Sequence, residues 1–269
     1  GNGSLILKIH IQTQKKGKNK SSVIKINKNA FQYYLGSKNY KINCVVIKIE
    51  PYKNENLKIT PSKKLEKQLK GKSIIIFGSN GILGTFTKNY LSKYKTNLHL
   101  VTKTKNQTNS ALVKHYELNT INFSNLKKIL KKAYPDYIFY FVSPKILRNN
   151  NKNINKKLYN LYKLYYVTIF DKILKIIKNS KKKIFIFYPS TVALNEKNKS
   201  FKYSKEYKTT KHLGEKLCKT KKSKKIIPIS YRIDQIKSPQ NYNIAGFYEG
   251  NSIRTLKKYI DDFLLKSQI

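Results

Sequence analysis

The chain has 269 residues, of which 39% are hydrophobic, and this length allows one or two domains with a substantial core. No apolar run approaches a membrane span and no signal-peptide pattern opens the chain, so we expect no membrane partner. The formal net charge of +44 comes from lysines scattered over every segment, with only three arginines, which favours a solvated lysine surface and only non-specific binding to nucleic acid.

Residues 1–70 are predicted to form a small β-rich N-terminal unit and a linker, whose role the sequence does not indicate. Short alternating or apolar stretches at 5–11, 23–26 and 42–49 are typical of strands. Residues 29–35 are predicted as a short helix, and 62–70 as a basic helix that closes at a glycine.

Residues 71–269 are predicted to form a second domain, in which strands alternate with helices. Apolar runs predict strands at 74–77, 97–102, 113–118, 136–143, 184–188 and 226–232. Helical spacing follows the first run and recurs at 126–133, 158–178, 203–218 and 252–265. This alternation predicts an α/β fold of Rossmann type, a parallel sheet with helices on both faces.

Three glycines follow the first of these strands and open a helix. Gly78 lets the chain turn off the strand, Gly81 lets backbone N–H groups approach a pyrophosphate, and Gly84 lets the helix pack closely on the sheet. The positive end of the helix dipole would then face the phosphates. A tight turn without a ligand is the alternative. The predicted cofactor-binding residues are Gly78, Ser79, Asn80, Gly81, Ile82, Leu83 and Gly84.

The end of the second strand is where a dinucleotide's adenosine ribose would lie. An acidic residue there would bind the 2′-hydroxyl of NAD, but this chain has Lys103 and Lys105, which complement a 2′-phosphate. We therefore favour NADP(H), with NAD(H) as the other possibility. Glu117, at the end of the third strand, is predicted to accept a hydrogen bond from the adenine amino group.

Tyr207 and Lys211 are predicted to form the catalytic pair. They are four residues apart on a predicted helix, so they share a face, and an ammonium beside a phenol lowers the phenol's pKa. A hydroxyl from Ser190 or Thr191 could hold a substrate carbonyl. A tyrosine four residues before a lysine occurs three times, no more often than chance predicts, but only Tyr207 follows a strand that ends in small hydroxyl residues.

The glycines of 78–84, the segment 189–191, and Tyr207, Lys211 and Glu215 occur in an order that resembles the short-chain dehydrogenase/reductase superfamily. The glycine spacing is similar to that of its extended, epimerase-like branch. The resemblance covers about residues 72–240.

This resemblance implies that Tyr207 is the catalytic acid/base and that Lys211 lowers its pKa and holds the nicotinamide ribose. It implies that Ser190 or Thr191 is the hydroxyl partner. Arg232, after the sixth strand, would contact an anionic part of the substrate. The resemblance also implies a homo-oligomer.

The chain departs from the family pattern at three places. Residues 141–144 replace the usual small residues after the fourth strand, and the typical asparagine of the long helix is absent among Tyr165, Tyr166 and Thr168. Only about 35 residues follow the sixth strand, which is short for a substrate-capping region.

The remaining chemistry-bearing residues indicate no metal or disulfide site. The four histidines are isolated in sequence. Cys44 and Cys218 lie in separate apolar segments and are predicted to be buried free thiols, which favours a cytoplasmic protein.

The sequence therefore predicts an NAD(P)-dependent oxidoreductase that transfers hydride between a nicotinamide and a small-molecule carbonyl or secondary alcohol. One alternative is a sugar-nucleotide epimerase or dehydratase with bound NAD. The other is a catalytically silent Rossmann subunit of a larger basic or RNA-containing assembly.

Overall fold

A computed structural model describes residues 61–103, 109–118, 124–146, 153–195, 204–237 and 252–267, together with the backbone of four N-terminal strands. The chain falls into two compact units, one holding these four strands and the other a six-stranded sheet with its helices. No helix among the described residues has both the length and the apolar composition to cross a membrane.

The N-terminal strands form an antiparallel sheet in the order β1-β4-β3-β2. They are β1 (Ser4–Thr13), β2 (Ile24–Asn27), β3 (Ala30–Leu35) and β4 (Tyr40–Lys48). The helix predicted over 29–35 is wrong, because 30–35 is strand β3, paired on both sides. Aromatic residues favour strands, and so short a helix has little stability of its own, so pairing on two sides prevails.

The second unit contains a parallel six-stranded sheet in the order β10-β9-β8-β5-β6-β7. Its strands are β5 (Ser73–Phe77), β6 (Asn97–Thr102), β7 (Val113–Glu117), β8 (Tyr137–Tyr140), β9 (Ile184–Thr191) and β10 (Ile226–Ile233). The order runs outward in both directions from the neighbours β5 and β8. This doubly wound order confirms the predicted Rossmann-type fold, in which ligands bind at the carboxyl ends of the strands near the switch point.

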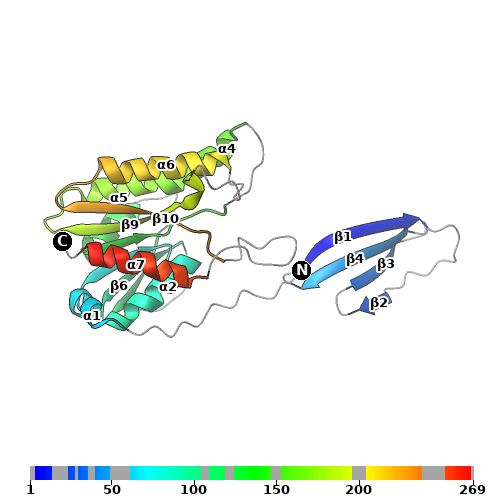
Figure 1. Ribbon diagram of the computed structural model, residues 1–269, viewed down its shortest axis with the longest axis horizontal. Helices are drawn as coiled ribbons and strands as arrows, with labels where there is room; N and C mark the ends of the chain where they lie inside the picture. Colours follow the sequence, from blue (N-terminus) through cyan, green and yellow to red (C-terminus); the bar gives the residue numbers. More distant parts are fainter. Residues whose placement is uncertain are drawn as a thin grey trace. The chain divides into compact units, whose positions relative to one another are not determined.

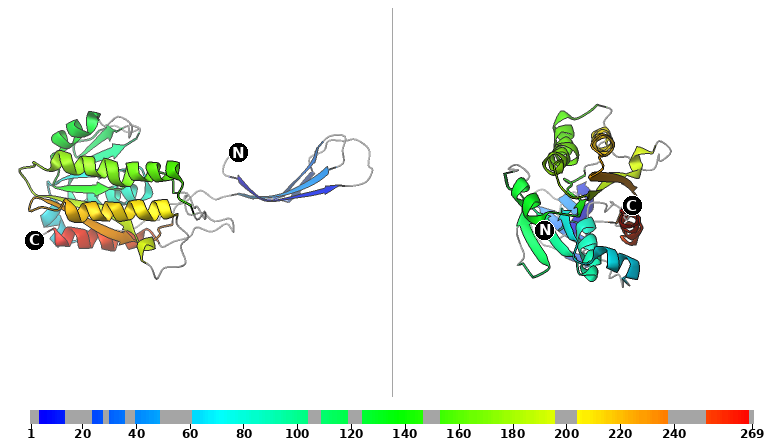
Figure 2. Two further views of the ribbon diagram at one scale, coloured as in Figure 1. Left: turned by 90° about the horizontal axis from the view of Figure 1, so that it is seen from above. Right: turned by 90° about the vertical axis from the view of Figure 1, so that its left-hand side faces the viewer.

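Helices cover both faces of this sheet (Figure 1). One apolar core lies between the sheet and α1 (Lys63–Leu69), α2 (Ile82–Leu91) and α7 (Arg254–Lys266). The other lies between the sheet and α3 (Ser124–Ala133), α5 (Ile169–Ile177) and α6 (Lys205–Thr220). Figure 2 shows α5 and α6 running along the same side of the sheet. Strands covered on both faces explain the unbroken apolar runs in the sequence.

The long helix predicted over 158–178 forms, but it changes its winding in the middle. It consists of α4 (Lys156–Lys163), a π-helical segment η2 (Leu164–Thr168), and α5. A π-helical turn displaces backbone carbonyls from their normal α-helical partners. Here the carbonyl of Tyr165 accepts a hydrogen bond from the Tyr140 hydroxyl, and that of Tyr166 accepts one from the Tyr188 hydroxyl at 3.0 Å. Tyrosines from β8 and β9 therefore hold this segment against the sheet.

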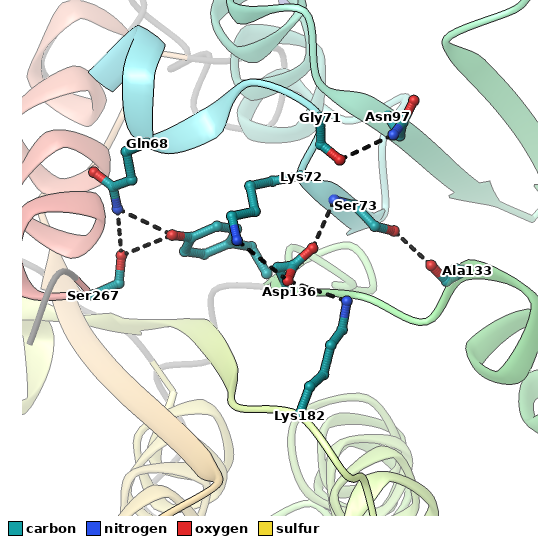
Figure 3. A network of polar contacts seen from close by, with 10 residues as sticks. Gln68, Gly71, Lys72, Ser73, Asn97, Ala133, Asp136, Lys182 and Ser267 are labelled. Carbon is teal, nitrogen blue, oxygen red and sulfur yellow. Dashed lines mark hydrogen bonds and ion pairs between the residues drawn. The ribbon is translucent and has the colours of Figure 1, made fainter. Parts of the chain in front are cut away.

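A polar network fastens the amino-terminal edge of the sheet (Figure 3). Asp136, just before β8, accepts a hydrogen bond from the backbone N–H of Ser73 at 2.9 Å and pairs with Lys182 at 3.1 Å. Gln68 of α1 donates to the Ser267 hydroxyl at 2.9 Å, which joins the first and last helices. The edge opposite the candidate site is thus cross-linked by side chains.

Candidate functional site

The turn between β5 and α2 requires glycine at two positions for packing reasons. Gly78 has φ +76°, and a Cβ there would lie 2.7 Å from the backbone oxygen of Phe141. A Cβ on Gly84 would lie 2.3 Å from the backbone oxygen of Gly78. Both approaches are to backbone atoms and are shorter than a real contact allows. The fold alone therefore explains these two glycines.

Gly81 differs, because the protein leaves space beside it. A Cβ there would contact only the Gly78 oxygen at 3.4 Å, an ordinary distance, and the residue has φ −71° and is exposed. Neither packing nor backbone conformation calls for glycine at this position. A missing side chain on the open side of the turn suits the approach of another molecule to the backbone.

The start of α2 offers unpaired hydrogen-bonding groups to an anion. Gly81 is its N-cap and supplies no side-chain cap, and the first backbone N–H groups of a helix have no acceptor within the helix. The Ser79 side-chain oxygen is buried and has no hydrogen-bond partner among the described residues. Free N–H groups, a helix dipole and an unpartnered hydroxyl fit a diphosphate. The residues present therefore fit the dinucleotide that the glycine spacing predicts.

A continuous series of contacts leads from this turn to the predicted catalytic pair. Gly78 lies against Phe141, at the end of β8. Two residues further on, the Ser143 side-chain oxygen is 2.7 Å from the hydroxyl of Tyr166. The Tyr166 ring in turn contacts the ring of Tyr207 edge-on, with centroids 5.7 Å apart. The glycine turn and the predicted catalytic pair thus lie at the same edge of the sheet, across the switch point.

Tyr207 is the third residue of α6 and lies in its first turn. The hydroxyl of Ser204, the N-cap residue, accepts a hydrogen bond from the Tyr207 backbone N–H at 3.2 Å. The Tyr207 ring is buried among the rings of Tyr162 and Tyr166. Lys211 is one turn further, and its Nζ lies 5.8 Å from the centroid of the Tyr207 ring. The predicted proximity of the two side chains is therefore present.

Lys211 is buried, and a backbone carbonyl anchors its ammonium group. Its Nζ donates a hydrogen bond to the Pro189 oxygen at 2.7 Å. The last paired residues of β8 and β9 are Phe139 and Phe187. The Pro189 carbonyl therefore lies beyond the hydrogen bonds that join these two strands. Burial lowers the pKa of Lys211 from 10.5 to about 7, although the negative charge of Glu215 opposes this shift.

The two predicted hydroxyl partners are engaged elsewhere. The Ser190 hydroxyl donates to Glu215 at 2.6 Å. The Thr191 hydroxyl accepts from the Ala193 backbone N–H at 3.2 Å and caps a short 3₁₀ turn. Successive residues of a strand point to opposite faces, so only one of the two can face α6. Ser190 is the one that reaches α6.

The remaining predicted ligand-binding residues lie at the same carboxyl edge. Arg232, in β10, is bound through Nε and Nη2 to the Glu215 carboxylate, each at 2.9 Å. Lys103 and Glu117, beside the ends of β6 and β7, are both exposed. Lys105 lies outside the described residues.

Sequence analysis assigned no role to Ser143 or Tyr166, which the structure places between the glycine turn and Lys211. Both residues lie where the sequence departs from the family pattern, after the fourth strand and on the long helix, and these departures could have drawn attention to them. No group of three or more potential metal ligands occurs among the described residues. Cys218 is a buried free thiol, as predicted, whereas the side chain of Cys44 is not among the described parts.

A model of the NAD dependent epimerase/dehydratase family matches residues 74–261 of the chain. An epimerase from Methanothermobacter thermautotrophicus is 18% identical in sequence, over 65% of this chain and 55% of that one, with a TM-score of 0.51. A short chain dehydrogenase from Burkholderia cenocepacia, solved in complex with NADP, is 9% identical over 60% of this chain and 71% of that one, with a TM-score of 0.50.

MoeE5, solved in complex with UDP-glucose and NAD, is 13% identical over 62% of this chain and 56% of that one, with a TM-score of 0.50. The chain thus spans little more than half of the first and third of these proteins. At such identities the likeness to solved structures shows the fold. A search of curated proteins gives no match.

Proposed function

The chain belongs to the NAD dependent epimerase/dehydratase family, and we propose that it is an NAD(P)-dependent enzyme that transfers a hydride between the nicotinamide and a carbonyl or secondary alcohol. The resemblance stated from the glycine turn and the Tyr-Lys pair is thereby confirmed. The observation that supports the chemistry is the anchored Lys211 one turn from Tyr207, at the edge of the sheet that also carries the glycine turn.

In this proposal Tyr207 handles the proton. A bound nicotinamide would supply or accept the hydride. When a carbonyl is reduced, the Tyr207 hydroxyl would give its proton to the carbonyl oxygen. When an alcohol is oxidised, the Tyr207 oxygen takes the proton of the substrate hydroxyl. The Lys211 amino group would favour the phenolate form of Tyr207, either through its positive charge or by donating a hydrogen bond. Ser190 would position the substrate oxygen only after leaving Glu215, and Thr191 would have to leave its cap.

Residues at the ends of β5, β6 and β7 would bind the cofactor. The free N–H groups of the α2 N-terminus and the Ser79 hydroxyl would hold the diphosphate. We favour NADP(H), because the exposed Lys103 follows β6, where a 2′-phosphate would lie. Glu117 would accept a hydrogen bond from the adenine amino group. Arg232 would contact the substrate through the part of its guanidinium that faces solvent.

A second candidate is a sugar-nucleotide epimerase or dehydratase, and the family description favours it. Both candidates begin with the same hydride transfer, but an epimerase returns the hydride and leaves the nicotinamide unchanged overall. Absorbance at 340 nm separates the two. A reductase consumes one reduced nicotinamide for each product, whereas an epimerase converts substrate with no net change.

Fluorescence titration with NADPH and NADH tests the cofactor site. Gly81→Asp should fold, because its Cβ meets only an ordinary contact and aspartate is a favourable N-cap. It should nevertheless lose nucleotide affinity, since the carboxylate would fill the place of the phosphates. Asn89→Asp, exposed near the other end of α2, makes the same charge change away from the site and should bind like the wild type.

Binding of neither nucleotide at micromolar concentration would overturn the enzyme proposal. Affinity for RNA that falls steeply with salt, without nucleotide binding, would instead support the catalytically silent assembly subunit. The homo-oligomer and the cytoplasmic location stay predictions, and light scattering of the purified chain tests the first.

A further inference from the structure

Tyr166 presents its ring face to the ammonium group of Lys211. The Lys211 Nζ is 4.0 Å from the centroid of the Tyr166 ring, against 5.5 Å for Tyr188 and 5.8 Å for Tyr207. A cation within about 6 Å of an aromatic face is attracted by the negative charge of that face, and more strongly where water is excluded. Tyr166 and Lys211 are both buried. Among the described residues, Tyr166 is therefore the aromatic ring with the shortest contact to this cation.

Contacts at both ends hold the Tyr166 ring in this orientation. Its hydroxyl is 2.7 Å from the Ser143 side-chain oxygen, on the segment after β8. Its backbone carbonyl accepts a hydrogen bond from the Tyr188 hydroxyl. The ring also stacks on that of Tyr162, one turn earlier, with centroids 5.9 Å apart. The side chain thus has little freedom to rotate away from the lysine.

We propose that Tyr166 is a positioning residue for Lys211, whose ring face holds the ammonium group against the Pro189 carbonyl and whose hydroxyl ties this arrangement to Ser143. The value of this arrangement for catalysis rests on the proposed function, but the contact itself does not. Ser143 follows Phe141, the residue against which Gly78 packs. The positions of the glycine turn and of the lysine are therefore linked through one tyrosine.

The groups that face Lys211 set the expected result of removing the ring. From α6 these are the Glu215 carboxylate, which favours the charged lysine, and Tyr207. From β9 the facing group is Tyr188, and from η2 it is Tyr166. Arg232 and Ser190 in turn bind Glu215. Burial lowers the pKa of Lys211 to about 7, and the Tyr166 ring acts against that shift, so its loss should lower the pKa further.

The test is an NMR titration of the intact chain with 13C-labelled lysine, in which the Lys211 Cε signal is assigned by its absence from Lys211→Met. Tyr166→Leu should lower the Lys211 titration midpoint by roughly 0.4–1.5 pH units. Tyr166→Phe keeps the ring and should titrate close to the wild type. Phe170→Leu is the matched control, because Phe170 is a buried ring on the same long helix that packs on Tyr140 and Tyr188. The titration midpoint of Lys211 should be the same in Phe170→Leu as in the wild type.

A second substitution keeps the ring shape in case Tyr166→Leu does not fold. Pentafluorophenylalanine at position 166 reverses the charge of the ring face, so its midpoint should lie below that of Tyr166→Phe. An unchanged or raised midpoint in both ring variants would overturn the proposal. A lowered midpoint in a chain that binds no nicotinamide nucleotide would support the positioning role and reject the proposed function. With an active enzyme, the pH profile of kcat should shift for Tyr166→Leu but not for Phe170→Leu.

Discussion

Arg232 holds the Glu215 carboxylate with two nitrogens, Nε on one oxygen and Nη2 on the other, each at 2.9 Å. The Ser190 hydroxyl donates a hydrogen bond to the same carboxylate at 2.6 Å. Burial alone would raise the pKa of Glu215, but the hydrogen bonds from Arg232 and Ser190 outweigh it and hold the pKa below its ordinary value. Three elements, β9, β10 and α6, are thus joined at one carboxylate beside the proposed catalytic pair.

Arg232→Met should destabilise the fold by about 1–2 kcal/mol at neutral pH. This is less than for a fully buried pair, because the arginine side chain is 42% exposed. Because the pKa of Glu215 is lowered in the folded protein, its pairing with Arg232 stabilises the fold fully at pH values above the ordinary carboxyl pKa. This stabilisation is lost as the pH falls through the lowered pKa of Glu215. Denaturant unfolding at several pH values measures it. Lys216→Met, at an exposed position of α6, controls for the lost charge. A pH-independent difference for Arg232→Met would contradict the prediction.

Gly84→Ala should cost about 1–3 kcal/mol of stability and also weaken nucleotide binding. Its Cβ would meet the Gly78 oxygen and the Ser79 Cα at 2.3 and 2.6 Å, so α2 must move away from the turn. Gly81→Ala should cost less, about 0.5–1 kcal/mol because alanine is a poorer N-cap than glycine, while still weakening binding. Urea unfolding and NADPH titration of both variants provide the comparison. Equal stabilities would show that the close packing at Gly84 is not required.

The sequence predicted the Rossmann sheet and the glycine turn well because both depend on local rules. Apolar runs mark strands buried on two faces, and Gly78 sits where only glycine avoids the backbone that follows β8. The helix predicted over 29–35 failed because pairing with two neighbouring strands, which is non-local, decides the conformation of so short a segment.

The surroundings of Lys211 could not be predicted for a related reason. A period of 3.6 residues places Tyr166 on a helix, but it does not reveal the π-helical segment that tyrosines from two strands stabilise. Likewise, Arg232 was predicted to contact the substrate because of its charge and its place in the chain. In the structure most of its hydrogen bonds go to Glu215. Side-chain pairing across elements depends on register, which the sequence pattern does not contain.

Asp136→Ala should lower the stability of the sheet by about 1–3 kcal/mol without changing nucleotide affinity. The substitution leaves the Ser73 backbone N–H without its side-chain acceptor and Lys182 without its ion pair, at the edge opposite the site. Asp136→Asn keeps an acceptor and should lose less. Thermal unfolding and NADPH titration separate the two effects. Loss of affinity in a folded Asp136→Ala protein would mean that the two edges of the sheet are coupled.

Lys211→Met should remove activity but stabilise the fold, and the gain should shrink as pH rises. The folded pKa of Lys211 is about 7, against about 10.5 unfolded, so between these values the unfolded chain binds more protons and wild-type stability rises with pH. The advantage of methionine should therefore fall by about 1.4 kcal/mol for each pH unit above 7. Methionine also loses the hydrogen bond to the Pro189 oxygen, which costs about 1–3 kcal/mol at every pH and reduces the gain in stability by that amount. Lys216→Met, exposed on the same helix, is the control in guanidinium unfolding at pH 6, 8 and 10. A difference between Lys211→Met and wild type that stays constant over this range would show that the lysine keeps its proton in the folded protein, and the balance of charge and burial described for the site would then be wrong.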